Sequence, residues 1–286
     1  MSKVLDELLE ILDLEQLSEN QFVGHSPMDT RKRVFGGQVA AQSLIAAGRT
    51  DSGKRPHSLH GYFLQPGDIN MPILFEVDRI RDGKSFATRR VVASQNGEPI
   101  FNLSTSFHRD EEGAAHQIPM PQVPDPQELP TFKERMAPWA SQLGDWNDRL
   151  RPLEQRYVDT PPYDIREDPR EPRQQVWVRA DGQLPDDPLL HAAIMTYATD
   201  MSLLDTVMLP HRISRLSANL MLASLDHSVW FHRPFRTDEW FLFDLESPVS
   251  YGARALIQGH VFSQDGNLVA SVVQEGLFRT TKPAEA

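Results

Sequence analysis

The sequence predicts an α+β fold in which one structural unit, a helix followed by antiparallel strands, occurs twice. Three features of the 286 residues lead to this prediction. Segments with helical spacing precede runs of alternating apolar and polar residues in both halves. A proline-rich stretch separates the two halves. Residues 90–97 resemble residues 259–266 in polarity and turn chemistry, which indicates an internal repeat.

Two helices are predicted in the first half. Residues 3–14 carry apolar side chains at positions 4, 5, 8, 9 and 12 with acidic residues between them, which is typical of an amphipathic helix. A second helix is predicted over residues 39–47, opened by the stretch VFGGQ at residues 34–38. Its small side chains allow another backbone to come close, so we expect it to be buried against a sheet.

The spacing of apolar residues changes to a period of two after the second helix. Strands are predicted over residues 57–64, 73–81, 86–95 and 100–108. Asp82-Gly83 and Asn96-Gly97 separate strand pairs, and both dipeptides favour tight hairpins because glycine adopts positive φ without strain. We therefore expect an antiparallel meander.

Prolines dominate the middle of the chain. Residues 110–173 hold half of the 22 prolines, a density that excludes long helices and central strands. We expect a linker wrapped on the surface, with short helices within residues 127–150. The predicted organisation is an N-terminal domain over residues 1–110, a linker over residues 111–173 and a C-terminal domain over residues 174–286.

The second half repeats the order of the first. A strand is predicted over residues 174–179 and a helix over residues 189–204. Further strands are predicted over residues 216–224, 227–232, 240–247, 255–262 and 268–278. Asp265-Gly266 predicts a hairpin turn before the last strand.

Composition excludes several classes of function. Lys and Arg number 29 against 40 Asp and Glu, a formal charge of −11, so a general nucleic-acid-binding protein is not expected. The absence of cysteine excludes disulfides, zinc–thiolate sites and cysteine nucleophiles. No run of about 18 apolar residues occurs, so no membrane span is expected. The acidic start is unlike a signal peptide and the last three residues form no peroxisomal address, so we expect a cytoplasmic protein.

Sequence motifs narrow the chemistry further. The chain lacks the Gly-x-Ser-x-Gly nucleophile elbow, the Gly-x-x-x-x-Gly-Lys-Ser/Thr phosphate loop and the His-Glu-x-x-His zinc helix. His57 and His60 would point to opposite faces of a strand, which favours hydrogen-bonding roles over a shared metal. The same spacing argument favours packing and surface roles for His227 and His232. Neither a metal nor a redox cofactor is expected.

Three polar residues stand out in apolar surroundings. Asp200 lies on the predicted helix 189–204, where a carboxylate is costly unless it is hydrogen-bonded, solvent-facing or functional. Gln274 follows the apolar run 269–273, and a buried amide needs partners. Ser224 ends another apolar strand, where a hydroxyl is also common as a turn residue.

Five sequence blocks together point to a known family. They are VFGGQV (34–39), YFLQPGD (62–68), RDGKSF (81–86), DHSVWFHRP (226–234) and VQEG (273–276). The chain resembles the TesB-type acyl-CoA thioesterase II family nearly from end to end, and least in its proline-rich centre. The resemblance implies a tandem double hotdog fold, with each half a long helix wrapped by an antiparallel sheet. It also implies hydrolysis of acyl-CoA to a free fatty acid and CoA.

The resemblance further implies a catalytic set. The family holds and activates a water with an Asp, a Thr or Ser, and a Gln. These correspond to Asp200, Ser224 and Gln274 in this sequence. Asp200 is expected to act as the general base while the hydroxyl and the amide fix the water, without a covalent acyl-enzyme.

The substrate-binding residues are expected around the first-half helix. Gly36, Gly37 and Gln38 lie at its start, where backbone N–H groups near the two glycines are candidates for binding the thioester oxyanion. His60 is expected to line the same site. Such a site would use both halves of the chain.

Two other functions stay open at this stage. The stretch DDPLLH at residues 186–191 resembles the Asp-x-Asn-Pro-Leu-His motif of hotdog enoyl-CoA hydratases, with the proline one place early and the asparagine missing. A helix start is favoured there, with Asp186 or Asp187 as the N-cap and Pro188 at the first helical position. A non-catalytic module that binds acyl-CoA is the third alternative.

Substrate and assembly follow from the resemblance. The expected partners are a medium- to long-chain acyl-CoA as substrate and CoA as product. The expected assembly is a homodimer or homotetramer.

Overall fold

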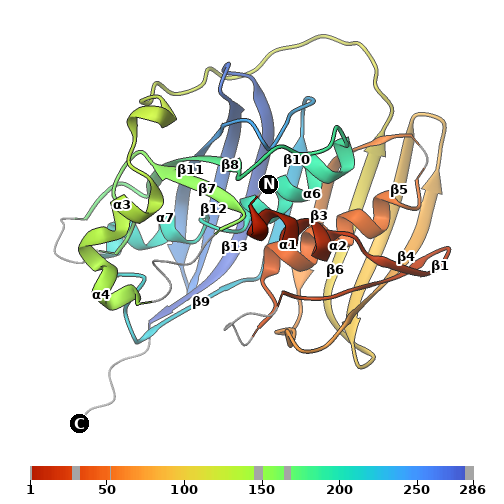
Figure 1. Cartoon of the computed structure of the whole chain (residues 1–286), viewed down its shortest axis with the longest axis horizontal. Helices are drawn as coiled ribbons and strands as arrows, with labels where there is room; N and C mark the ends of the chain where they lie inside the picture. The colour runs from red at the N-terminus through yellow and green to blue at the C-terminus, as the bar shows by residue number, and fades with distance from the viewer. Residues whose placement is uncertain (1, 28–32, 52, 145–150, 164–168, 281–286) are drawn as a thin grey trace.

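The computed structural model describes residues 2–27, 33–51, 53–144, 151–163 and 169–280 (Figure 1). The elements of the first half are α1 (Lys3–Leu12), β1 (Glu15–Ser18), β2 (Gln21–Gly24), α2 (Gly36–Gly48), β3 (Arg55–Phe63), β4 (Ile73–Asp82), β5 (Phe86–Gln95) and β6 (Glu98–His108). Both predicted helices and all four predicted strands are present. Strands β1 and β2 were not predicted, because four residues are too few to show a period.

The middle and the second half complete the chain. The middle contains η1 (Pro126–Glu128), α3 (Phe132–Met136), η2 (Ala137–Trp139), α4 (Ala140–Leu143) and β7 (Leu153–Tyr157). The second half contains β8 (Arg173–Ala180), α6 (Pro188–Thr199), α7 (Asp205–Met208), η3 (Leu209–His211), β9 (Leu220–Ser224), β10 (Asp226–Phe231), β11 (Phe241–Tyr251), β12 (Arg254–Ser263) and β13 (Leu268–Thr280). None of the described helices is long and apolar enough to cross a membrane.

The strands of the described residues form one antiparallel sheet. Their order is β1-β2-β4-β5-β6-β3-β10-β13-β12-β11-β8-β7, with β9 paired to β13. Counted outward from the contact between β3 and β10, the two halves repeat one topology. The duplicated unit predicted from the sequence is therefore confirmed, and two hotdog units share a continuous sheet through the pairing of Leu59 with Val229.

The predicted four-strand meander is wrong in one respect. Strands β4, β5 and β6 are consecutive neighbours, and Asn96-Gly97 forms the second hairpin with φ angles of 51° and 81°. Strand β3, however, pairs with β6 rather than with β4. This position leaves the other edge of β3 free to pair with β10, and so places β3 at the centre of the double sheet.

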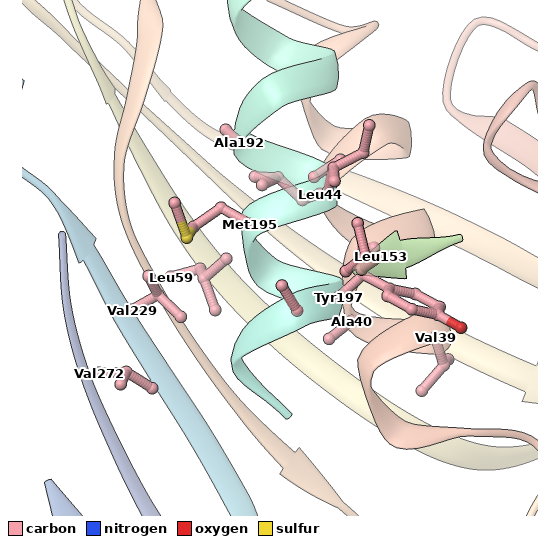
Figure 2. Packing of buried hydrophobic residues seen from close by; sticks show 14 of the residues in the cluster. Val39, Ala40, Leu44, Leu59, Leu153, Ala192, Met195, Tyr197, Val229 and Val272 are labelled. Carbon is pink, nitrogen blue, oxygen red and sulfur yellow. The ribbon is translucent and has the colours of Figure 1, made fainter. Parts of the chain in front are cut away.

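Helices α2 and α6 pack against each other on one face of the sheet (Figure 2). Every residue of α2 from Gly37 to Ala47 is buried, as its small side chains predict. A Cβ at Gly48 would lie 2.5 Å from the side chain of Leu189, so the glycine permits the close approach of the two helices. From α6, Met195 points toward Leu59 and Val229, on the two strands that join the halves.

The segment 111–173 is more than a surface linker. Met120, Val123 and Leu129 pack against a second, smaller core of Trp177, Trp240, Leu242 and Phe262, so the connection covers part of the second half. The indole N–H of Trp177 donates to the carbonyl of Pro124 at 3.0 Å. The segment also supplies β7, which pairs with β8 at the edge of the sheet. The domain boundaries at residues 110 and 173 stay a prediction.

Enlarging a small residue of the helix pair is expected to destabilise the fold. Ala40 is fully buried on α2, so Ala40→Leu should lower the free energy of unfolding by about 1–3 kcal/mol through overpacking. Urea unfolding measures the change, with Ala114→Leu on an exposed stretch as the control. Equal stability of the two variants would contradict the close packing described for this helix.

Candidate active site

Asp200 lies where the two halves meet. The predicted helix over residues 189–204 is wrong at its end, because α6 stops at Thr199 and Asp200 is its C-cap. A carboxylate at a helix C-terminus is disfavoured by the helix dipole. Its side chain instead reaches the N-terminus of α2 in the other half, where backbone N–H groups favour negative charge.

Three donors hold the Asp200 carboxylate. The backbone N–H of Gly37 donates to Oδ2 at 2.7 Å, and the Ser224 hydroxyl donates to Oδ1 at 2.8 Å. Nε2 of Gln274 donates to the same Oδ1 at 3.0 Å and also donates to Ser224 Oγ. The structure therefore brings together the three residues predicted to be catalytic, and joins Gly37 to them.

The two glycines allow the backbone of α2 to approach the carboxylate. A Cβ at Gly36 would lie 2.7 Å from Asp200 Oδ2, and one at Gly37 would lie 2.6 Å from the carbonyl oxygen of Tyr197. Because the Gly37 N–H is bonded to Asp200, it is not a free donor for a substrate oxyanion. Within the described part of the chain the N–H of Gly36 has no hydrogen-bond partner, so of the two glycine N–H groups it is the one free to donate.

Neighbouring strands position the hydroxyl and the amide. Ser224 ends β9 and pairs in register with Gly276 on β13, two residues beyond Gln274. Gln274 itself is fully buried. At the start of β10 the Asp226 carboxylate accepts from the N–H of Glu275 at 2.6 Å, which holds the junction of β9 and β10 against β13 beside the site.

His227 also belongs to this network, although sequence reasoning gave it only packing or surface roles. It is fully buried, and burial lowers its pKa. Nδ1 lies 3.0 Å from Gln274 Oε1, and Nε2 lies 2.8 Å from Thr199 Oγ1. Its place in the block DHSVWFHRP was the sequence signal that could have identified it.

A cavity of about 620 Å³ opens beside the carboxylate. Its lining includes Gly36, Val39 and Phe63 from the first half and Asp200 and Ser224 from the second. Most of its remaining wall is apolar. The further lining residues include Val34, Phe35, Leu64, Ile100, Met201, Leu204, Leu222 and Leu225, together with Arg33 and Arg215. The arrangement suits an apolar chain whose polar end lies at Asp200.

Gln38 was predicted to bind substrate, but the structure gives it a different environment. Its side chain is buried and Nε2 donates to the carbonyl of His25 at 3.2 Å and to Ser26 Oγ at 3.0 Å. It therefore holds the segment before α2 rather than lining the cavity. The helical spacing explains the difference, since Gln38 and Gly36 lie on different sides of the helix.

His60 is a second correction. Leu59 on β3 is buried beneath the helices, and alternate residues of a strand face opposite sides, so His60 lies on the outer face of the sheet. There Nδ1 is 3.1 Å from Ser228 Oγ and the ring packs edge-on against Trp230. It does not line the cavity.

The motif at residues 186–191 forms a helix start, as favoured from the sequence. Asp187 is the N-cap of α6 and accepts from the N–H of Leu189 at 2.9 Å, with Pro188 at the first helical position. Asp186 pairs with Arg236 at 3.2 Å, whereas His191 accepts from the backbone N–H of Thr237 at 3.2 Å. The Asp/His pair that a hydratase needs is thus divided between different partners.

The other paired histidines form hydrogen bonds. His57 Nε2 lies 2.8 Å from Ser106 Oγ, and His232 Nε2 lies 2.8 Å from Ser271 Oγ. Among the described residues no group of three or more His, Asp or Glu side chains is placed to hold a metal ion.

Comparisons with known proteins point to one family. A family model described as acyl-CoA thioesterase matches residues 155–277, and one described as acyl-CoA thioesterase N-terminal domain matches residues 24–108. Human acyl-coenzyme A thioesterase 8 is 38% identical over 285 positions, covering 94% of this chain and 88% of that protein. Acyl-CoA thioesterase 2 of Haemophilus influenzae is 35% identical, covering 98% and 99%. The crystal structure of the acyl-CoA thioesterase II TesB2 from Mycobacterium marinum has a TM-score of 0.80 at 42% identity, covering 98% and 100%.

The fold and these matches define a thioester hydrolase built from two hotdog units. With relatives above 30% identity along almost the whole chain, the family is established. The chain belongs to the TesB-type acyl-CoA thioesterase II family.

Buried histidines are expected to make stability depend on pH. Burial lowers the pKa of His191 from its usual value of 6.5, so the unfolded chain binds a proton more readily than the fold. The free energy of unfolding should therefore fall as pH drops below about 6.5. Urea unfolding at about pH 7.5 and about pH 5.5 should show a larger loss for the wild type than for His191→Asn, whose amide cannot titrate. Carboxylates titrate alike in both proteins, so an equal loss of unfolding free energy in both would contradict a lowered pKa for His191.

Proposed function

We propose that this enzyme hydrolyses medium- to long-chain acyl-CoA by direct attack of a water that Asp200 activates. The observation that carries the proposal is the position of the carboxylate, in the wall of an apolar cavity and bonded to three donors. A carboxylate offers about four acceptor sites, so one acceptor site is left for a water.

The reaction follows in two steps. Asp200 takes a proton from the water as its oxygen bonds to the thioester carbonyl carbon, and the carbonyl oxygen becomes an oxyanion. Collapse of this intermediate breaks the carbon–sulfur bond, and the proton held by Asp200 goes to the departing sulfur of CoA. The carboxylate is restored, so the step balances without a cofactor. Holding the water in place supplies much of the rate, because a free carboxylate is a weak base.

The N–H of Gly36 is the proposed donor to the oxyanion. It belongs to the first turn of α2 and lines the cavity beside Asp200. A preorganised donor of this kind contributes about 10²–10³ in rate. The same helix N-terminus thus faces both the carboxylate and the developing charge.

The alternatives are less well supported. A hydratase needs Asp186 and His191 to act on one substrate, but their side chains have separate partners. A non-catalytic acyl-CoA-binding module would have no need for a buried amide and a hydroxyl bonded to one carboxylate oxygen. A cytoplasmic location and a homodimer or homotetramer stay predictions.

Removing the base should abolish most of the activity. Asp200→Asn is expected to lower kcat for thiol release from acyl-CoA by about 10²-fold or more, because the amide cannot accept the proton. A thiol reagent measures release, and the enzyme adds no thiol background because it has no cysteine. Asp186→Asn, on an exposed acid near the other end of α6, is the control and should keep wild-type activity. Unchanged release by Asp200→Asn would contradict the proposed base.

Turnover should leave no acyl group on the protein. Ser224 Oγ donates to Asp200 and accepts from Gln274, so its role is to hold the water and the base rather than to attack. Enzyme quenched with acid during turnover should keep its unmodified intact mass. A stoichiometric acyl adduct on Ser224 would contradict direct attack by water.

A larger residue in the cavity wall should change the chain-length preference. Leu222 lines the cavity, whereas its neighbour Met221 is exposed on the other side of β9. Leu222→Trp is expected to raise KM for long acyl chains by about tenfold relative to short ones, since lost methylene contacts discriminate by such factors. Met221→Trp should leave the profile unchanged. Equal effects of the two substitutions would place the acyl chain elsewhere.

A further inference from the structure

We propose that His227 is a positioning residue, which fixes the Gln274 amide so that Nε2 rather than Oε1 faces Asp200 and Ser224. The inference rests on the proposed function, since it assigns a role at the same site. It adds a residue that acts on the base and its water only through Gln274.

The contacts of His227 form a continuous chain behind the site. Its ring is fully buried on β10, with Nδ1 at 3.0 Å from Gln274 Oε1 and Nε2 at 2.8 Å from Thr199 Oγ1. Thr199 is the last residue of α6 and precedes Asp200 in the chain. The network therefore leads from Asp200 through Gln274 and His227 back to the end of the same helix.

The chemistry of the amide sets the tautomer of the imidazole. Nε2 of Gln274 donates to Asp200 Oδ1 and to Ser224 Oγ, so the amide turns its nitrogen toward the site and its oxygen toward His227. Its Oε1 can only accept, and the ring nitrogen facing it must carry the proton. His227 is therefore an Nδ1–H imidazole with a bare Nε2. The Thr199 hydroxyl has two acceptors within reach, this nitrogen at 2.8 Å and the carbonyl of Thr196 at 3.0 Å, and a bare Nε2 takes its proton.

This tautomer makes the flipped amide unfavourable at both ends. A flip would bring Oε1 toward Asp200 Oδ1, and two acceptor oxygens would then face each other where a hydrogen bond now forms. It would also set the amide N–H groups against the Nδ1–H of His227. Ser224 would then lose the donor that holds its hydroxyl toward Asp200.

The neutral state of His227 supports the same role. Burial lowers its pKa, so the ring stays uncharged at neutral pH and a single N–H selects the amide orientation. The other buried histidine with a lowered pKa, His191, differs because its Nε2 has no hydrogen-bond partner among the described residues. Of these two histidines, only His227 has a hydrogen-bond partner at each ring nitrogen.

The test compares two substitutions that differ in one donor. His227→Asn places Nδ2 where Nδ1 lies and can still donate to Gln274, whereas His227→Leu of similar size cannot. Both lose the contact to Thr199. We expect His227→Leu to lower kcat about 10–100-fold and to change KM by less than about threefold, because a misplaced catalytic group lowers the rate rather than the affinity for substrate. We expect His227→Asn to keep most of the kcat that His227→Leu loses. An equal loss of kcat in both variants would overturn the proposal.

A double-mutant cycle tests whether His227 acts through Gln274. In a Gln274→Ala background, adding His227→Leu should lower kcat by less than about twofold, because the amide it orients is gone. Fully additive losses would show that the histidine acts by another route. If Asp200→Asn is inactive while His227→Leu keeps full activity, the proposed function stands and the positioning role fails.

The wild-type enzyme gives a readout that does not depend on the folding of a variant. A long-range ¹H–¹⁵N spectrum of histidine-labelled protein at neutral pH should show one ring in a fixed Nδ1–H neutral form. This signal should be absent in His227→Asn, which assigns it. An Nε2–H or doubly protonated His227 would contradict the proposed orientation of the amide.

Discussion

The hydrogen bond from the backbone N–H of Gly37, at the N-terminus of α2, to the Asp200 carboxylate is the constraint on which the site depends. Placing a partly buried carboxylate at the end of α6 is costly unless donors meet it. The Gly37 N–H, the Ser224 hydroxyl and the Gln274 amide supply those donors from two halves of the chain. The site therefore exists only when the two hotdog units are assembled.

The approach of α2 to α6 follows from this constraint. A side chain at Gly36 would occupy the place of the Asp200 oxygen, and the small residues of α2 let it lie buried from Gly37 to Ala47. The N-terminus of α2 has no side-chain cap of its own, since Phe35 is its N-cap residue. Asp200 meets that need from the other half, so one contact serves both helix capping and the proposed chemistry.

The duplicated fold does not duplicate this arrangement. At the opposite end of the helix pair α6 begins with its own cap, Asp187, and Gly48 of α2 packs against the apolar Leu189. The second cavity near that end has charged and histidine side chains, including Asp186 and His191. Their partners are Arg236 and Thr237, both from the loop before β11.

Local patterns predicted most of the elements but not how they meet. Period-two spacing located β3 to β6, yet it could not tell that β3 pairs with β6 and β10, because pairing partners lie far apart in sequence. Helical spacing carried the prediction past Thr199, because Met201 continues the apolar stripe of the helix beyond its end. Edge strand β7 lay in a proline-rich segment, where proline excludes central strands but tolerates edges.

The sequence likewise predicted some residues of the candidate site and misplaced or missed others. The family resemblance predicted Asp200, Ser224 and Gln274 as the catalytic set, and the fold brings these three side chains within hydrogen-bonding distance. It did not distinguish Gln38 and His60, which face away from the cavity, from Gly36, which lines it. His227 was missed because its contact with Gln274 arises only from the pairing of β10 with β13.

A crystal structure with a non-hydrolysable acyl-CoA analogue, in which a methylene replaces the thioester sulfur, shows directly whether Asp200 and Gly36 face the reacting carbonyl. We expect the acyl chain in the 620 Å³ cavity, the carbonyl oxygen at the Gly36 N–H, and a water between the carbonyl carbon and Asp200. A carbonyl bound near His191 and Arg236 in the second cavity, or seated on Ser224 with no water at Asp200, would contradict this expectation.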